Sequence, residues 1–127
     1  MNRYEMDRLF QNYVNGWKKS DKQLIISTCD VTCEIIECYG PVYKGTNQIE
    51  SWIDAWISRH HRVKQWDILR NYIDTASLTA VFEWAFKCYS GKKDHHFKGC
   101  SVVQYNSTYI TCIKEYRMEA VHYYPYE

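Results

Sequence analysis

Two residues of this sequence, Glu37 and Tyr13, have side chains and surroundings suited to proton transfer. Glu37 follows Ile35 in the alternation of a predicted strand, so both face one side, and burial among apolar neighbours would raise the pKa of the Glu37 carboxyl toward that of a general base. Tyr13 lies on the apolar stripe of a predicted helix, where its ring is buried and its hydroxyl needs a partner. The alternatives are structural: a shift of register places Glu37 in solvent, and Tyr13 is a core residue.

Two later stretches present apolar side chains on one face and are candidates for a cavity wall. Trp84 and Phe86 share the more apolar face of the stretch 78–89. Ser101, Val103 and Tyr105 share one face of the stretch 95–105. A cavity between these strands and the helices would have a largely apolar wall, although ordinary core packing explains the same pattern.

The other reactive side chains favour structure over chemistry. No CxxC pair occurs, and the adjacent histidines cannot both face one site within regular structure, so we expect neither a metal nor a cofactor. The six cysteines are expected to be reduced and buried. Polar groups on the predicted sheet indicate a cross-strand ion pair or, alternatively, an anchor for an acidic ligand; they are Arg70, Tyr72, Glu115 and Arg117.

The composition narrows the classes of partner. The chain has 127 residues, 46% of them hydrophobic, which is enough for one core. Its formal charge of +1 comes from charged residues spread along the sequence, so no concentrated positive field would attract nucleic acid. Charges interrupt the first residues and every apolar segment, so we expect no signal peptide, no membrane span and a cytoplasmic location.

Periodicity predicts three helices before most of the strands. Apolar residues recur at helical spacing from Met6 to Trp17, a short helix follows a cap at Ser20, and a third helix follows Gly45 with Thr46 or Asn47 as its cap. The predicted strands are 31–39, 63–74, 78–89, 95–105 and 109 to about 124. Short links between the last four predict hairpins and an α+β order of elements.

Three stretches carry a resemblance to a known family. The stretch 13–17 followed by Ser20-Asp21, the stretch 34–41 followed by Tyr43-Lys44-Gly45, and the stretch 99–105 followed by 113–116 resemble the SnoaL-like branch of the nuclear transport factor two-like superfamily. The resemblance spans nearly the whole chain. It implies one domain, residues 1–127, in which a cone-shaped, curved antiparallel sheet carries three helices from the first half of the chain on its concave face, around a small-molecule pocket.

Ketosteroid isomerase is a member of this superfamily, and its catalytic pattern can be placed on this sequence. The resemblance puts Glu37 at the carboxylate base, Tyr13 at the phenol donor and Ser101 at the protonated carboxylic acid. It also lets Trp17, Trp52 and Trp56 line the pocket, although core packing is the simpler explanation for all three. Serine is a weaker donor than a carboxylic acid, and glutamate is one methylene longer than the expected aspartate, so steroid isomerisation itself is not expected.

Three functions follow as hypotheses. The first is a cofactor-independent enzyme of the isomerase, cyclase or dehydratase type, in which Glu37 moves a proton and Tyr13 stabilises an oxyanion. The second is a module that binds a small apolar or aromatic molecule without chemistry. The third is an interaction domain whose outer sheet face forms a homodimer.

Overall fold

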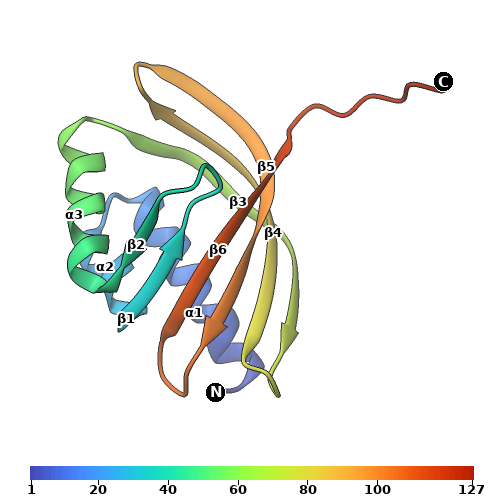
Figure 1. Ribbon diagram of the computed structural model, residues 1–127. Helices are drawn as coiled ribbons and strands as arrows, with labels where there is room; N and C mark the ends of the chain where they lie inside the picture. Colours follow the sequence, from blue (N-terminus) through green and yellow to red (C-terminus); the bar gives the residue numbers. More distant parts are fainter.

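The computed structural model describes residues 1–127 and contains three helices and six strands (Figure 1). The helices are α1 (Arg3–Lys18), α2 (Lys22–Ser27) and α3 (Gly45–Ser58). The strands are β1 (Cys29–Ile36), β2 (Val42–Lys44), β3 (Arg62–Asp74), β4 (Thr79–Ser90), β5 (Lys93–Tyr105) and β6 (Ile110–Glu119). None of the helices combines the length and the apolar character needed to cross a membrane.

The strands form one open sheet in the order β2-β1-β6-β5-β4-β3, and the helices lie on one side of its curved surface (Figure 1). The α+β class and the cone-like arrangement are confirmed. One pair differs from a purely antiparallel sheet, because β1 and β6 run parallel. After β1 the chain crosses through β2 and α3 to the far edge, and the meander from β3 to β6 returns to β1 in the same direction.

Helix α1 positions the first candidate residue. Asn2 caps the helix by accepting a hydrogen bond from the Glu5 backbone N–H at 2.8 Å. Its apolar stripe is buried as predicted, and the Phe10 ring stacks on Phe82 of β4 with centroids 4.3 Å apart. This packing holds Tyr13, one turn further along, against the same face of the sheet.

The predicted caps of the second and third helices were wrong. The cap of α2 is Asp21, whose carboxylate accepts from the Leu24 N–H at 3.1 Å, because Ser20 has a left-handed backbone (φ 52°) as the chain leaves α1. Helix α3 starts at Gly45, and its N-cap residue, Lys44, lies two residues before Thr46 and three before Asn47 and makes no side-chain cap bond. There, the Gln48 side chain accepts from the Lys44 N–H at 2.7 Å.

The first strand ends three residues earlier than predicted, at Ile36. Residues 37–41 form a tight turn in which the Glu37 N–H donates to the Pro41 carbonyl at 2.9 Å and the Gly40 N–H donates to the Glu37 carbonyl at 3.0 Å. The turn leads into β2, which pairs with β1 and was not predicted, because three residues are too few to show alternation. Glu37 therefore lies in a turn fixed by backbone hydrogen bonds.

The last strand is also shorter than predicted, ending at Glu119 instead of near residue 124. Glu119, opposite Phe97, is the last residue of β6 that pairs with β5, although β5 itself begins four residues earlier, at Lys93. Residues 120–127 extend away from the sheet (Figure 1), and the Tyr126 side chain is 99% exposed. The alternation of apolar residues in this segment therefore reflects no burial.

Gly99 allows β5 to pass directly beneath a large side chain of the pocket. A Cβ atom at this position would lie 2.8 Å from the Trp84 ring and would overlap the carbonyl oxygen of Tyr116. We expect Gly99→Ala to lower the free energy of unfolding by about 2 kcal/mol or more, because neither the backbone nor the buried ring can move away freely. Urea denaturation followed by tryptophan fluorescence measures this. Cys100→Ala on the opposite face is the control and should cost clearly less.

Candidate functional site

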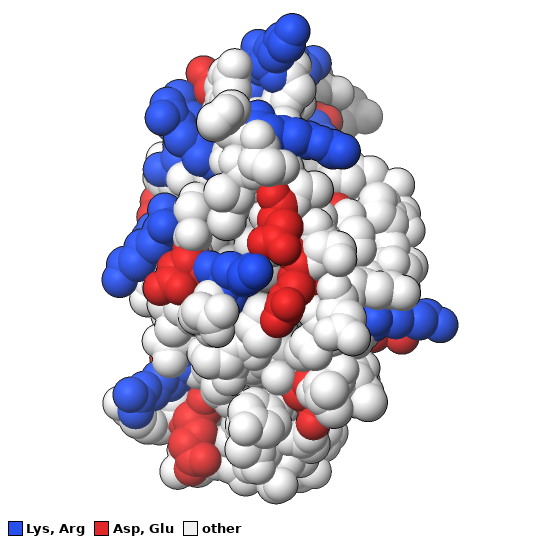
Figure 2. Space-filling view, turned by 90° about the vertical axis from the view of Figure 1, so that its left-hand side faces the viewer, with Lys and Arg blue, Asp and Glu red and all other residues white.

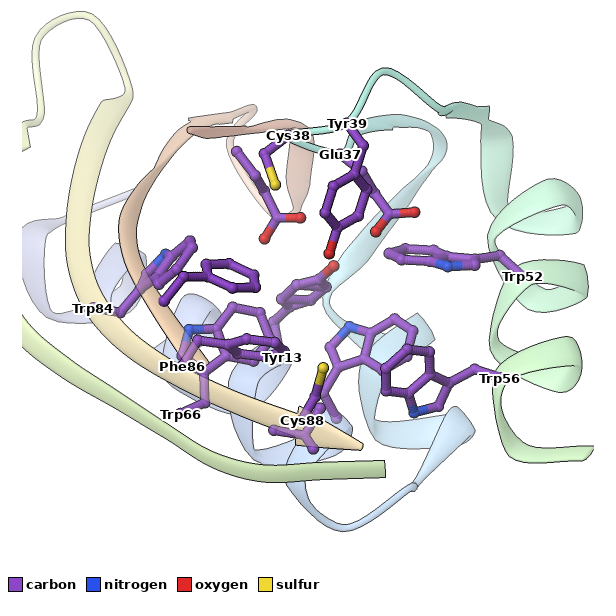
Figure 3. A pocket seen from close by; sticks show the side chains of 14 residues that line it. Tyr13, Glu37, Cys38, Tyr39, Trp52, Trp56, Trp66, Trp84, Phe86 and Cys88 are labelled. Carbon is purple, nitrogen blue, oxygen red and sulfur yellow. The ribbon is translucent and has the colours of Figure 1, made fainter. Parts of the chain in front are cut away.

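A pocket opens between the curved sheet and the helices, with α3 and the turn 37–41 on one side and β4 and β5 on the other (Figure 3). The centres of water-sized molecules have about 60 Å³ of space in it, well above the roughly 10–15 Å³ that one water needs. Twelve of its 14 lining residues are hydrophobic. These are Tyr13, Trp17, Cys38, Tyr39, Trp52, Trp56, Val63, Trp66, Trp84, Phe86, Cys88 and Phe97. The other two are Glu37 and Glu115; we call this space the inner pocket.

All five tryptophans of the chain line the inner pocket. The indole N–H groups of Trp17, Trp56 and Trp66 are buried and have no hydrogen-bond acceptor within the protein. An unpaired buried donor costs about 1–3 kcal/mol, and well-packed cores contain few of them. This wall is therefore not packed as a closed core.

Glu37 faces the inner pocket from the turn after β1 (Figure 3). The Tyr43 hydroxyl donates a hydrogen bond to Glu37 Oε1 at 2.7 Å, and the Tyr43 ring stacks on Trp52 with centroids 4.2 Å apart and planes at 9°. Burial raises the pKa of the Glu37 carboxyl, while the hydrogen bond from Tyr43 opposes this rise. The carboxylate is therefore held in one place and kept partly away from solvent.

Glu115 enters the same pocket from β6, opposite Ser101 in the register. Burial, and then the nearby charge of Glu37, raise the pKa of the Glu115 carboxyl to about 8. Glu115 is a half-buried residue and lines the inner pocket. At neutral pH Glu115 therefore holds a proton and can donate a hydrogen bond.

The predicted cross-strand ion pair on the sheet was wrong for Glu115. The ion pairs of the chain are Lys22–Asp54 at 3.1 Å and Lys64–Asp94 at 3.2 Å, so neither pocket glutamate has a cationic partner. The alternation of β6 contained the signal, because Glu115 follows the buried Ile113 on the same face.

Two tyrosine hydroxyls point toward one another in the space beside Glu37 (Figure 3). Tyr13 comes from α1, and Tyr39 comes from the turn after β1. Burial raises the pKa of Tyr13 well above its ordinary value, with a further rise from the charge of Glu115. Tyr13 is therefore a neutral hydrogen-bond donor throughout the physiological range. The sequence pattern does not single out Tyr39, because it predicts a strand to residue 39, whereas β1 ends at Ile36 and Tyr39 lies in a turn.

The other residues selected from the sequence fall into two groups. Ser101 is buried outside the inner pocket, where its hydroxyl accepts a hydrogen bond from Trp84 Nε1 at 2.9 Å, so it orients a wall residue. Val103 and Tyr105 lie further along β5 in the closed part of the core, and the Tyr105 hydroxyl donates to the Met6 carbonyl at 2.8 Å. The residues that do line the pocket are Trp17, Trp56, Trp84 and Phe86.

Two carboxyl groups and two tyrosine hydroxyls meet here, and side chains of these types can transfer protons. No three His, Cys, Asp or Glu side chains are arranged to hold a metal ion. The two carboxyl groups in this apolar space have different pKa values, because a charge on one disfavours ionisation of the other. With Tyr43 stabilising its charged form, Glu37 is the carboxylate, and Glu115 is the carboxylic acid.

No known protein-family model matches this chain, and no curated protein sequence does. Solved structures match over most of its length. An LEH-like epoxide hydrolase from M. tuberculosis has a TM-score of 0.79 at 15% identity, covering 91% of this chain and 84% of that one. A protein of unknown function with a cystatin-like fold from Methylobium petroleophilum has a TM-score of 0.74 at 20% identity, covering 100% and 83%.

A third match is a hypothetical protein with a ketosteroid isomerase-like fold from Catenulispora acidiphila, in complex with trimethylamine. Its TM-score is 0.73 at 12% identity, and the match covers 85% of this chain and 83% of that one. The chain therefore has the SnoaL-like, nuclear transport factor two-like fold that the sequence motifs predicted. At these identities the likeness shows the fold alone.

The raised pKa of Glu115 makes folding stability depend on pH. The folded chain holds this proton more tightly than the unfolded chain, so the free energy of unfolding falls as the pH rises from about pH 5 to about pH 8. Glutamine cannot ionise. We therefore expect Glu115→Gln to gain stability relative to the parent chain across this range, measured by urea denaturation at a series of pH values. Glu119→Gln, an exposed change on the same strand, should run parallel to the parent; parallel curves for both variants would contradict a buried acid at position 115.

Proposed function

We propose that this protein is a cofactor-independent proton-transfer enzyme that acts on a small, largely apolar molecule in the inner pocket. Reactions of the isomerase, cyclase or dehydratase type share the needed step, in which a C–H proton is removed and negative charge develops on an oxygen. The observation that carries the proposal is the pair of glutamates, Glu37 and Glu115, which face one aromatic pocket with no cationic partner.

Each polar group of the pocket has a role in this proposal. Glu37, ionised and held by Tyr43, takes the proton from the substrate carbon. The electron pair moves to a substrate oxygen, which receives hydrogen bonds from the Glu115 carboxylic acid and the Tyr13 hydroxyl. Apolar walls strengthen both interactions because they exclude water. Glu115 thus supplies the acid that the resemblance had placed at Ser101.

A ring-opening elimination tests this base without knowledge of the natural substrate. In nitrobenzisoxazole, a base removes the ring C–H proton, the N–O bond breaks, and a coloured nitrile phenolate forms. We expect Glu37→Gln to lower kcat/KM for this reaction by about 100-fold or more, because a general base contributes roughly that much. The rate should rise with pH as Glu37 ionises, with an apparent pKa above that of an ordinary glutamate.

Glu34→Gln is the matched control, since Glu34 lies on β1 outside the inner pocket. It should leave the rate near that of the parent. Equal rates for the parent and Glu37→Gln would rule out Glu37 as the base. Quenching of the pocket tryptophans by the compound, without turnover, would instead support a module that binds small apolar molecules.

We also propose a homodimer formed through the outer face of the sheet. Three large side chains on this face are exposed: Tyr72 by 51%, Tyr116 by 56% and Met118 by 54%. Val81 and Val102 are half-buried and lie beside Tyr72 in one cross-strand row over β3, β4 and β5. A row of apolar side chains on a sheet face suits an isologous contact with a second copy.

Sedimentation velocity measures this association. We expect the parent chain to sediment as a dimer at tens of micromolar and Tyr116→Lys to sediment as a monomer, because two copies of a new charge would be brought into the contact. Tyr4→Lys is the control, since Tyr4 is exposed on α1 and away from the outer sheet face. A monomeric parent at that concentration would end the dimer proposal and leave the pocket function unaffected.

A further inference from the structure

A second, wider hollow lies directly outside the inner pocket. It offers about 360 Å³ to the centres of water-sized molecules, and it shares part of its wall with the inner pocket. The shared residues are Glu37, Tyr39, Trp52 and Trp56. A ligand can therefore occupy both spaces at once; we call the outer one the rim hollow.

Basic side chains surround the rim hollow. Arg59 and His61 come from the end of α3 and the link to β3, His95 comes from β5, and Arg117 comes from β6. Figure 2 shows Lys and Arg side chains gathered at the upper end of the molecule, the end that carries the β4–β5 hairpin in Figure 1. Four basic residues from three parts of the chain thus converge on one opening of an otherwise apolar pocket.

The two arginines are available to a ligand. Neither takes part in the ion pairs of the chain, which are Lys22–Asp54 and Lys64–Asp94. The Arg117 guanidinium carbon lies 4.6 Å from the centre of the Phe97 ring, and Phe97 also lines the inner pocket. This cation–π contact fixes the guanidinium at the boundary between the two spaces while its N–H groups remain unpaired with any carboxylate.

His61 and His95 make hydrogen bonds at the edge of the rim hollow. The Gly91 N–H donates to His61 Nε2 at 3.3 Å, and the His61 ring meets Trp56 edge to face at 5.0 Å. His95 Nε2 donates to the Ser90 carbonyl at 3.1 Å. His61 thus connects the β4–β5 hairpin to α3, and His95 makes a hydrogen bond within the hairpin. The two sides of the rim hollow are therefore held in fixed positions.

One negative group, Glu37, also borders the rim hollow. Its carboxylate accepts the Tyr43 hydrogen bond at 2.7 Å and faces the inner pocket as well. A negative group on a ligand is therefore favoured on the side of Arg59 and Arg117 and disfavoured next to Glu37. This separation gives a ligand one preferred orientation.

We infer that the ligand is a small amphipathic carboxylate, whose apolar body enters the inner pocket and whose carboxylate binds Arg59 and Arg117 in the rim hollow. The planar guanidinium groups match a carboxylate with paired hydrogen bonds. The inference rests on the proposed function and names its substrate class. It places the carbon atoms of the body, and not the charged end, beside Glu37 and Glu115.

Phenylbutyrate, phenylbutanol and phenylbutylamine test this inference, because they share one apolar body and differ in the charge of the end group. Binding is followed by the fluorescence of the tryptophans, all five of which line the inner pocket. We expect phenylbutyrate to bind at least about fivefold more tightly than phenylbutanol. The preference should shrink when NaCl is raised from about 50 mM to about 500 mM.

Arg59→Gln and Arg117→Gln should each reduce the preference for phenylbutyrate by about twofold or more and leave the affinity for phenylbutanol unchanged. Arg70→Gln removes the same charge from an exposed position outside both spaces and is the control. Equal binding of acid and alcohol, tighter binding of the amine, or no effect of either rim variant would overturn the carboxylate site while leaving the pocket function in place. If none of the three compounds bound, both the pocket function and the carboxylate site would be wrong.

Discussion

The packing of α1 against the concave face of the sheet is the contact on which the rest of the structure depends. Phe10 stacks on Phe82 and meets Trp66 edge to face at 6.4 Å, and Tyr13 meets the same Trp66 at 6.1 Å. Aromatic side chains bury large areas with few rotatable bonds, so they set the separation of helix and sheet firmly. That separation determines where the Tyr13 hydroxyl lies and how wide the space beyond it is.

The layer of side chains between α1 and the concave face of the sheet is a filled core at one end and contains a pocket at the other. At one end Tyr105 of β5 donates to the Met6 carbonyl of α1, and residues such as Val103 close the core. At the other end the layer is made of indole rings, three of whose N–H groups find no acceptor. Indole rings are large, flat and rigid, and each carries an N–H donor. They therefore fill space less completely than aliphatic side chains do. The pocket therefore lies where the aromatic residues are concentrated.

Much of this could be predicted from the sequence, and the misses have physical reasons. The helix from Met6 to Trp17 and the four long strands show strong periodicity, because each has one buried and one exposed face. The turn at 37–41 and the three-residue β2 depend on backbone hydrogen bonds, which leave no alternation to detect. As a result Glu37 was identified as a pocket residue on the assumption of a strand position, whereas a turn presents it.

Glu115 shows a different limit of sequence reasoning. Its position on the inner face of β6 follows from alternation, but an ion pair with an arginine of the sheet was the simplest expectation for a charged residue there. Whether Glu115 forms an ion pair depends on the positions of the arginines in the folded chain. Arg117, two residues later on the same strand, reaches the rim hollow and stacks on Phe97, so it leaves Glu115 without a cation. Such a choice between partners depends on the curvature of the sheet, which no local pattern encodes.

The arrangement of charge from the rim inward explains how two carboxyl groups can persist in an apolar pocket. Full ionisation of both would place two like charges in a medium that screens them poorly, and the pKa of about 8 for Glu115 means that one proton stays bound at neutral pH. That proton takes the place of a cation, at a site where a guanidinium would fill the space needed by a ligand. Arg59 and Arg117 lie in the wall of the rim hollow, where they can bind the charged end group of the proposed ligand without forming an ion pair with Glu37. The proposed base, the proposed acid and the proposed anion site are compatible because the inner pocket and the rim hollow are adjacent but separate.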